Sequence, residues 1–297
     1  MGTSQSSDGP GPGVPMVPPW TPTIPPDPAP APPPAPPGLP GMPPGVPPAA
    51  GPPDMPPGVP PAPPQTPTEP QSPPLAPEKR FGGVRSNLGR FARSGDGRDL
   101  RRALGHYVRS GYGGSNIATR RFGGTAQTAE ALGRALYSIA TRAAVAPIDT
   151  AALTGRPTEE IATAIIEAIR HADGTQDAEA ERAAIYDAMS ELLARFPEAD
   201  LLNLSDAERE FVIERFTAID VARRFELDVG KQLLEKAATA TVAMARLKEI
   251  RSYIAETVAA SFRKLRNLGR TLTAGRVARV VQDALRDTFE VFEGYEE

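Results

Sequence analysis

The chain has 297 residues, of which 36 are proline, 27 are glycine and none is cysteine, and its formal net charge is −3. Of the prolines, 33 lie before residue 78, where too few backbone N–H groups remain for helix or sheet. The prolines therefore exclude a single compact domain. The absence of cysteine excludes a disulfide framework and a thiolate metal site. Two histidines are too few for a His-rich metal site, so we expect neither a metal nor a cofactor.

No apolar run reaches the roughly 20 residues that a membrane-spanning helix needs. The N-terminus also lacks the basic start and apolar stretch of a secretory signal. These features predict a cytoplasmic protein with no membrane partner.

Residues 1–20 begin small and polar and then place Val14, Met16, Val17 and Trp20 among prolines. Trp20 is the only tryptophan of the chain, and nothing near it in the sequence can form a core around it. We expect Trp20 to dock on another surface, with a solvent-exposed ring as the alternative.

Residues 21–78 form a low-complexity segment in which MPPGVPP occurs at residues 42–48 and again at 55–61. Polyproline II is the natural conformation of such a sequence, and at about 3.1 Å per residue the N-terminal tail could reach roughly 240 Å. We predict a disordered, proline-rich spacer that holds the N-terminus far from the rest of the protein.

Residues 79–124 form a basic segment with 11 basic and 2 acidic residues. A basic surface with interspersed aromatic rings is typical of nucleic-acid binding, because arginines replace counterions and rings stack on bases. The alternative is an arm that packs on the acidic remainder of the chain. The arginines of the nucleic-acid interpretation are Arg101, Arg102, Arg120 and Arg121, and the rings are those of Phe81, Phe91, Tyr107, Tyr112 and Phe122.

Residues 125–297 show the 3.6-residue periodicity of amphipathic helices and no alternating strand pattern. Ser205 and Glu208 fit a capping box at the start of one helix. The fold class predicted is an all-α body preceded by the disordered proline-rich tail. Besides a short basic helix at 99–109, helical segments are expected at 125–145, 158–172, 178–196, 205–219, 229–268 and 273–292.

We find no combination of nucleophile, base and orienting group in the sequence. Neighbouring acids such as Glu159 and Glu160 are expected on the solvent face of a helix rather than in a catalytic site. The sequence therefore predicts a protein that is not an enzyme and has no catalytic residues.

Gly2 offers a different kind of reactive group, because removal of Met1 would expose its α-amine. The pKa of such an amine is about 7.7 to 8.0, so an appreciable fraction is neutral and nucleophilic near neutral pH. Gly2 has no side chain to obstruct an enzyme tunnel, and the hydroxyls of residues 3–7 can form specific hydrogen bonds. The Met1-Gly2 start with Ser6 also matches an N-myristoylation pattern, which the bacterial composition of the chain does not favour.

The opening MGTSQSSDGPGPGVPMVPPW, the proline-rich spacer, the segment from Arg80 to Gly124 and the helical remainder together resemble the QatB family of the bacterial Qat anti-phage defence system. The likeness covers the whole layout and is most specific in residues 1–20 and 80–124. The resemblance brings no catalytic motif with it, in agreement with the lack of a nucleophile, base and orienting group in the sequence.

The resemblance implies three partners, an ATPase (QatA), a QueC-like enzyme of 7-deazaguanine chemistry (QatC) and a TatD-like nuclease (QatD). It also implies that the QueC-like enzyme recognises the N-terminal peptide and joins a deazaguanine to Gly2. The recognition sequence would then consist of Thr3, Ser4, Gln5, Ser6 and Ser7. Two other roles stay open, a nucleic-acid-binding adaptor that recruits the nuclease and a purely structural assembly protein.

Overall fold

The structure is a computed structural model that describes residues 13–17, 21, 75–77, 79–142, 148–170, 176–273 and 275–296. Helices make up the secondary structure of these residues, apart from one isolated β-bridge between Pro15 and Leu75. The all-α prediction for the body is therefore confirmed. The predictions for Gly2, residues 3–7 and Trp20 concern positions that lie outside the described residues.

The helices of the described residues follow one another along the chain with short connections. They are α1 (Gly82–Ser94), α2 (Gly97–His106), the π-helical turn η1 (Tyr107–Gly111), α3 (Ser115–Arg121), α4 (Gly123–Ala140), α5 (Thr150–Leu153), α6 (Thr158–Ile169), α7 (Gln176–Arg195), α8 (Asp206–Lys236), α9 (Ala240–Asn267), α10 (Val277–Glu293) and the 3₁₀ turn η2 (Gly294–Glu296).

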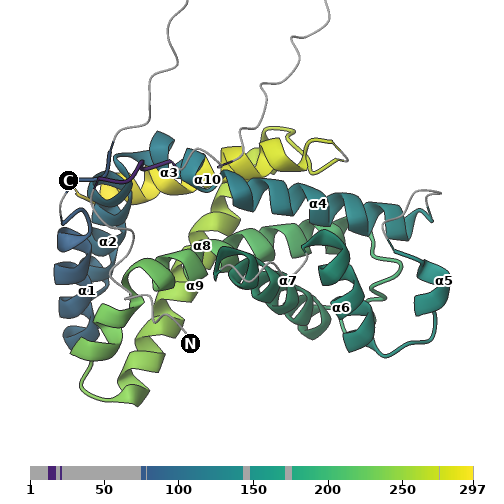
Figure 1. Cartoon of the computed structure of the whole chain (residues 1–297), viewed down its shortest axis with the longest axis horizontal. Helices are drawn as coiled ribbons and strands as arrows, with labels where there is room; N and C mark the ends of the chain where they lie inside the picture. The colour runs from purple at the N-terminus through teal and green to yellow at the C-terminus, as the bar shows by residue number, and fades with distance from the viewer. Residues whose placement is uncertain are drawn as a thin grey trace, which may run out of the picture. The chain divides into compact units, whose positions relative to one another are not determined.

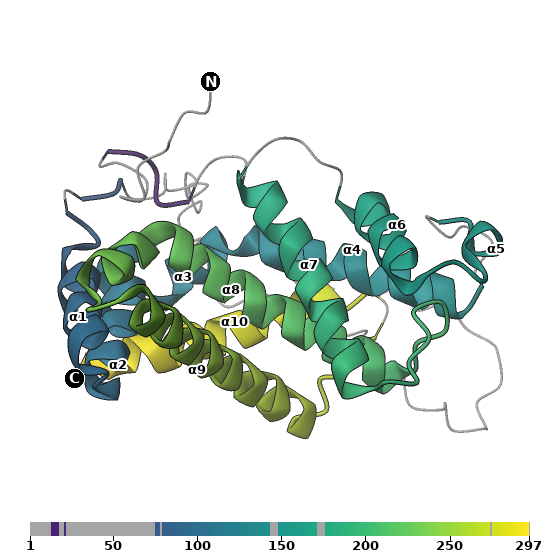
Figure 2. The same ribbon diagram turned by 90° about the horizontal axis from the view of Figure 1, so that it is seen from below.

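The long helix α8 holds the body together, because it packs against α1, α4, α7 and α9. Figure 1 shows α4 beside α10, and Figure 2 shows α9, which packs against both α8 and α10. The C-terminal turn η2 returns to α2, so the two ends of the helical body meet. No helix in the described part of the chain combines the length and the apolarity that a membrane span requires.

The start of α8 agrees with the sequence prediction. The Ser205 hydroxyl accepts a hydrogen bond from the Glu208 N–H, and the Glu208 carboxylate accepts one from the Ser205 N–H. This capping box satisfies two backbone donors that the first turn of a helix leaves without partners.

The boundary between α8 and α9 differs from the prediction of one helix over residues 229–268. Instead, α8 continues through Val229 to Lys236, and the chain reverses at residues 237–239. Neither proline nor glycine marks this turn. Thr239 caps α9 by accepting a hydrogen bond from the Val242 N–H at 3.2 Å, and the turn is fixed by the packing of α9 back onto α8.

The basic segment at 79–124 is part of the helical core, and the proposal that its aromatic rings stack on bases is wrong for all five of them. Each ring is at most 3% exposed, and Tyr107 packs on the Phe225 ring of α8 with centroids 4.9 Å apart. The alternative, packing against the rest of the chain, describes these rings correctly. Sequence composition could not separate the two cases, because a ring between arginines looks the same whether it faces a base or a core. The buried rings are Phe81, Phe91, Tyr107, Tyr112 and Phe122.

Candidate peptide-anchoring site

The N-terminal tail is attached to the helical body at residues 13–17. The Gly13 N–H donates a hydrogen bond to the Ala76 carbonyl at 2.9 Å, and the Ala76 N–H donates one to the Val14 carbonyl at 2.9 Å. These bonds form the antiparallel bridge between Pro15 and Leu75. We call this contact, between residues 13–17 and residues 75–77, the anchor (Figure 1, purple).

Apolar side chains fix the anchor to the body. Met16 and Val17 are only 5% and 6% exposed, whereas the neighbouring Val14 is 41% exposed. The Met16 sulfur packs against Gly113 in the turn that precedes α3, where Ile117 Cδ1 also lies close to this glycine. Such burial is the usual source of affinity when an extended peptide binds a folded surface.

Gly113 is required at this turn for two reasons. Its φ of +80° lies in the left-handed region that glycine adopts without strain. In addition, a Cβ at this position would lie 3.1 Å from the Met16 sulfur and 3.2 Å from Ile117 Cδ1, closer than such atoms normally pack. Gly113 therefore makes room for the tail, whereas a Cβ on Gly114 would meet Glu293 Oε1 at 3.3 Å.

The Asp228 carboxylate of α8 holds the segment that leads into the Gly113 turn. Tyr107 and Tyr112 both donate their hydroxyl hydrogen bonds to Asp228 Oδ2, at 2.9 and 2.6 Å. Burial raises the pKa of the Asp228 carboxyl, while the two hydroxyl donors and the positive charge of Arg121 oppose the rise. The shared acceptor fixes η1 and Tyr112, the residue directly before Gly113.

A second polar cluster joins α4, α7 and α8 inside the body. The Arg224 guanidinium donates hydrogen bonds to Asp220 Oδ2 at 3.0 Å and to Glu181 Oε1 at 2.8 Å. Thr125 and Thr128 of α4 donate to the same two carboxylates, at 2.6 and 2.9 Å. Burial and the nearby Asp220 charge raise the pKa of Glu181, while Arg224 opposes the rise. The cluster is a structural network whose hydrogen bonds join α4, α7 and α8, although Asp220 Oδ1 has no hydrogen-bond partner among the described residues.

The anchor changes the expected reach of the N-terminus. The sequence suggested a spacer that holds the N-terminus far from the body, but residues 13–17 return to the body at residues 75–77. Gly2 precedes Gly13 by eleven residues, and an extended chain spans at most about 3.5 Å per residue. Gly2 therefore cannot lie more than about 40 Å from the anchor while the anchor is closed.

The sequence contained a signal for the anchor. Val14, Met16 and Val17 are the first apolar cluster of the chain, but nothing local shows that Leu75 and Ala76 are their partners.

The four arginines singled out from the sequence divide into two groups. Three are exposed and form no ion pair with the described residues, whereas the fourth, Arg121, is half-buried with Nη2 3.9 Å from Asp177 Oδ2. The exposed three are Arg101, Arg102 and Arg120.

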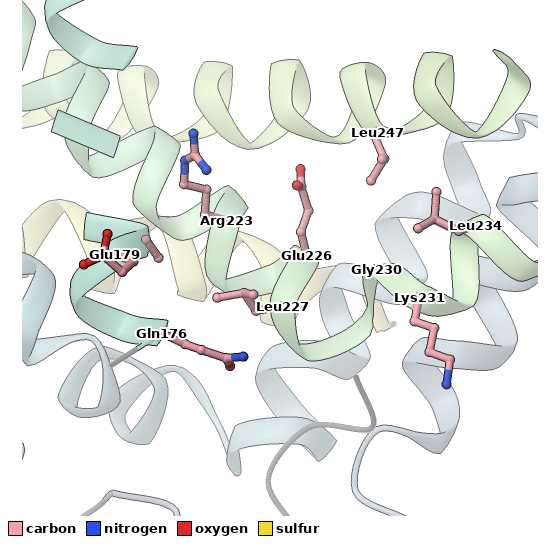
Figure 3. A pocket seen from close by; sticks show the side chains of 10 residues that line it. Gln176, Glu179, Arg223, Glu226, Leu227, Gly230, Lys231, Leu234 and Leu247 are labelled. Carbon is pink, nitrogen blue, oxygen red and sulfur yellow. The ribbon is translucent and has the colours of Figure 1, made fainter. Parts of the chain in front are cut away.

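Another surface feature is a groove along α8, between the start of α7 and α9. Figure 3 shows Leu227, Gly230 and Leu234 in a row on α8, with Leu247 of α9 opposite. Leu227 and Leu234 are 43% and 56% exposed, so this face of α8 presents an apolar strip between charged residues.

The fold and the anchor define a class of protein in which an all-α body binds a segment of its own N-terminal tail. The model of the family described as "Qat anti-phage system associated protein QatB" matches residues 113–292, about three-fifths of the chain. The protein therefore belongs to the QatB family and is a component of the Qat anti-phage system. No curated protein and no solved structure gave a significant match.

The matched range begins at Gly113, the residue under Met16, and runs nearly to the end of α10. The resemblance was most specific in residues 1–20 and 80–124, yet the match covers mainly the helical body. The two observations agree on the family while resting on largely different parts of the chain.

Proposed function

We propose that this protein is a non-enzymatic subunit of the Qat system whose N-terminal peptide is bound, and modified at the Gly2 amine with a 7-deazaguanine, by a QueC-like partner. Thr3 to Ser7 form the recognition sequence. The ATPase and the TatD-like nuclease are further partners. Family membership supports a role in the system, and the peptide role follows from the likeness of the first 20 residues.

The chemistry takes place in the partner. ATP activates the carboxylate of 7-carboxy-7-deazaguanine as an acyl-adenylate and pyrophosphate leaves. The neutral Gly2 amine then attacks the acyl carbon, so that an amide bond forms, AMP leaves and the amine loses a proton. The contribution of this chain is to hold the amine close to the partner's active site, which replaces a bimolecular encounter by a local one.

The observation that carries the proposal is the anchor. The body binds the tail at residues 13–17 and thereby keeps Gly2 within about 40 Å of a defined place on the fold. A peptide substrate delivered by a folded carrier needs such an attachment, whereas a tail that only aids solubility does not.

The test is the intact mass and the N-terminal peptide mass of this protein, expressed with and without the QueC-like partner. We expect a chain that lacks Met1 and carries a deazaguanine-sized adduct on Gly2 only when the partner is present. Gly2→Glu should abolish the adduct and phage protection, and Gly9→Glu serves as the matched control. An unmodified Gly2 in both cultures, or full protection by Gly2→Glu, would show that the proposal is wrong.

The alternative function is a nucleic-acid-binding adaptor that uses the basic segment to bring the nuclease to phage DNA. The exposed Arg101, Arg102 and Arg120 favour it, although the buried rings leave phosphate contact as the binding mode. DNA affinity should then fall steeply with salt and vanish when these arginines and Arg121 become alanine. Affinity that the alanine variant retains would exclude this function.

A further inference from the structure

We propose that the anchor limits the distance between the N-terminal peptide and the body. The partner enzyme that binds this peptide then has to dock on the end of the body that carries the anchor. This inference rests on the proposed function and adds to it the surface of the body that receives the partner. The surface is the turn at Gly113 with the exposed residues around it.

The length of chain between the recognition sequence and the anchor limits where the partner can bind. Ser7 precedes Gly13 by six residues, which span at most about 20 Å when extended. A globular enzyme of about 250 residues has a radius of gyration of about 18 Å, so its diameter exceeds this span. An enzyme that holds Ser7 in a cleft therefore lies within about 20 Å of the anchor, beside this end of the body.

The anchor is a specific contact between defined residues. It combines two backbone hydrogen bonds of 2.9 Å with two buried apolar side chains, over a glycine turn that has room for Met16. The Tyr107 and Tyr112 hydroxyls, bonded to Asp228, hold the segment that leads into that turn. Each part serves a defined position of residues 13–17 rather than a loose association.

The surface around the anchor carries exposed basic residues. Lys79 follows the paired residues 75–77 and is exposed. Arg120 is exposed and lies three residues after Ile117 on α3, so it shares a helix face with the side chain that lies against Gly113. The partner surface that fits these positive charges is acidic.

The experiment distinguishes access of the peptide to the partner's active site from recognition of the peptide. It uses a deletion that shortens the tail and a second change that releases the anchor. Residues are removed within Gly9–Pro12, to the longest extent at which a synthetic peptide of residues 2–17 is still modified by the QueC-like enzyme with ATP. In the full chain we expect this deletion to slow Gly2 modification at least tenfold, because the anchor no longer lets the peptide reach the active site. Adding Met16→Asp, which releases the anchor, should restore the rate.

Val14→Asp is the matched control for the rescue, because Val14 is exposed and its side chain is not part of the buried contact. The deletion combined with Val14→Asp should stay slow. Hydrogen exchange at the Ala76 amide, which donates to Val14, reports whether the anchor is open in each variant. Circular dichroism confirms that the helical body is intact in each variant.

A second measurement locates the partner directly. A carbodiimide, which joins an amine to a carboxylate, should link Lys79 of the wild-type chain to the bound enzyme, and this product should disappear with Met16→Asp. The inference is overturned when the deletion leaves the rate unchanged, when Met16→Asp fails to restore it, or when cross-linking at Lys79 is absent or survives release of the anchor. Wild-type Gly2 without any modification would instead refute the proposed function itself.

Discussion

Replacing Asp228 with alanine removes the acceptor that the Tyr107 and Tyr112 hydroxyls share. A hydrogen bond to a charged group contributes about 1.5 to 3 kcal/mol, and a buried hydroxyl left without an acceptor costs about 1 to 3 kcal/mol. Burial of the Asp228 carboxylate itself costs free energy, as its raised pKa indicates. The substitution removes this cost, which offsets part of the loss. We therefore expect Asp228→Ala to lower the free energy of unfolding by about 2 to 4 kcal/mol.

The assay is urea denaturation followed by far-UV circular dichroism. Asp187→Ala serves as the control, since the Asp187–Arg223 pair is partly exposed and such pairs contribute about 0 to 1 kcal/mol. Because Tyr112 directly precedes Gly113, Asp228→Ala should also speed hydrogen exchange at the Ala76 amide of the anchor. Equal losses for the two variants would refute the assignment of Asp228 as the support of this turn.

Four further changes test other parts of the structure. Gly113→Ala should open the anchor and speed its amide exchange, because the new Cβ conflicts with Met16 and with the positive φ; unchanged exchange would contradict this geometry. Ser205→Ala removes the α8 cap and should lower the free energy of unfolding by about 1 kcal/mol, and no loss would argue against the capping box. Gly230→Ala should raise the free energy of unfolding by about 0.5 to 1 kcal/mol, because alanine favours a helix interior and the new Cβ has room. A lower free energy of unfolding would show that α8 needs this glycine. The raised pKa of Glu181 means that the folded state binds its proton more tightly than the unfolded state, so stability falls as pH rises from the unfolded pKa through the folded one. Glu181→Gln should flatten that part of the pH profile, and an unchanged slope would exclude Glu181 as its source.

The sequence by itself determined the features that depend on neighbouring residues. The 3.6-residue periodicity predicted helices in the body, and the spacing of Ser205 and Glu208 predicted the start of α8. Both are local properties, since each is set within one or two turns of the backbone. The likeness that pointed to the family also lies in the order of residues along the chain.

Only the tertiary structure decided the features that join distant residues. Tyr107 and Tyr112 could have faced nucleic acid until Asp228, more than a hundred positions away, proved to be their partner. The reversal at 237–239 likewise has no glycine or proline signal and depends on the packing of α9 against α8. The anchor pairs residue 13 with residue 76, and no local pattern specifies such a pairing, because its stability comes from burial on a surface that exists only after the body has folded.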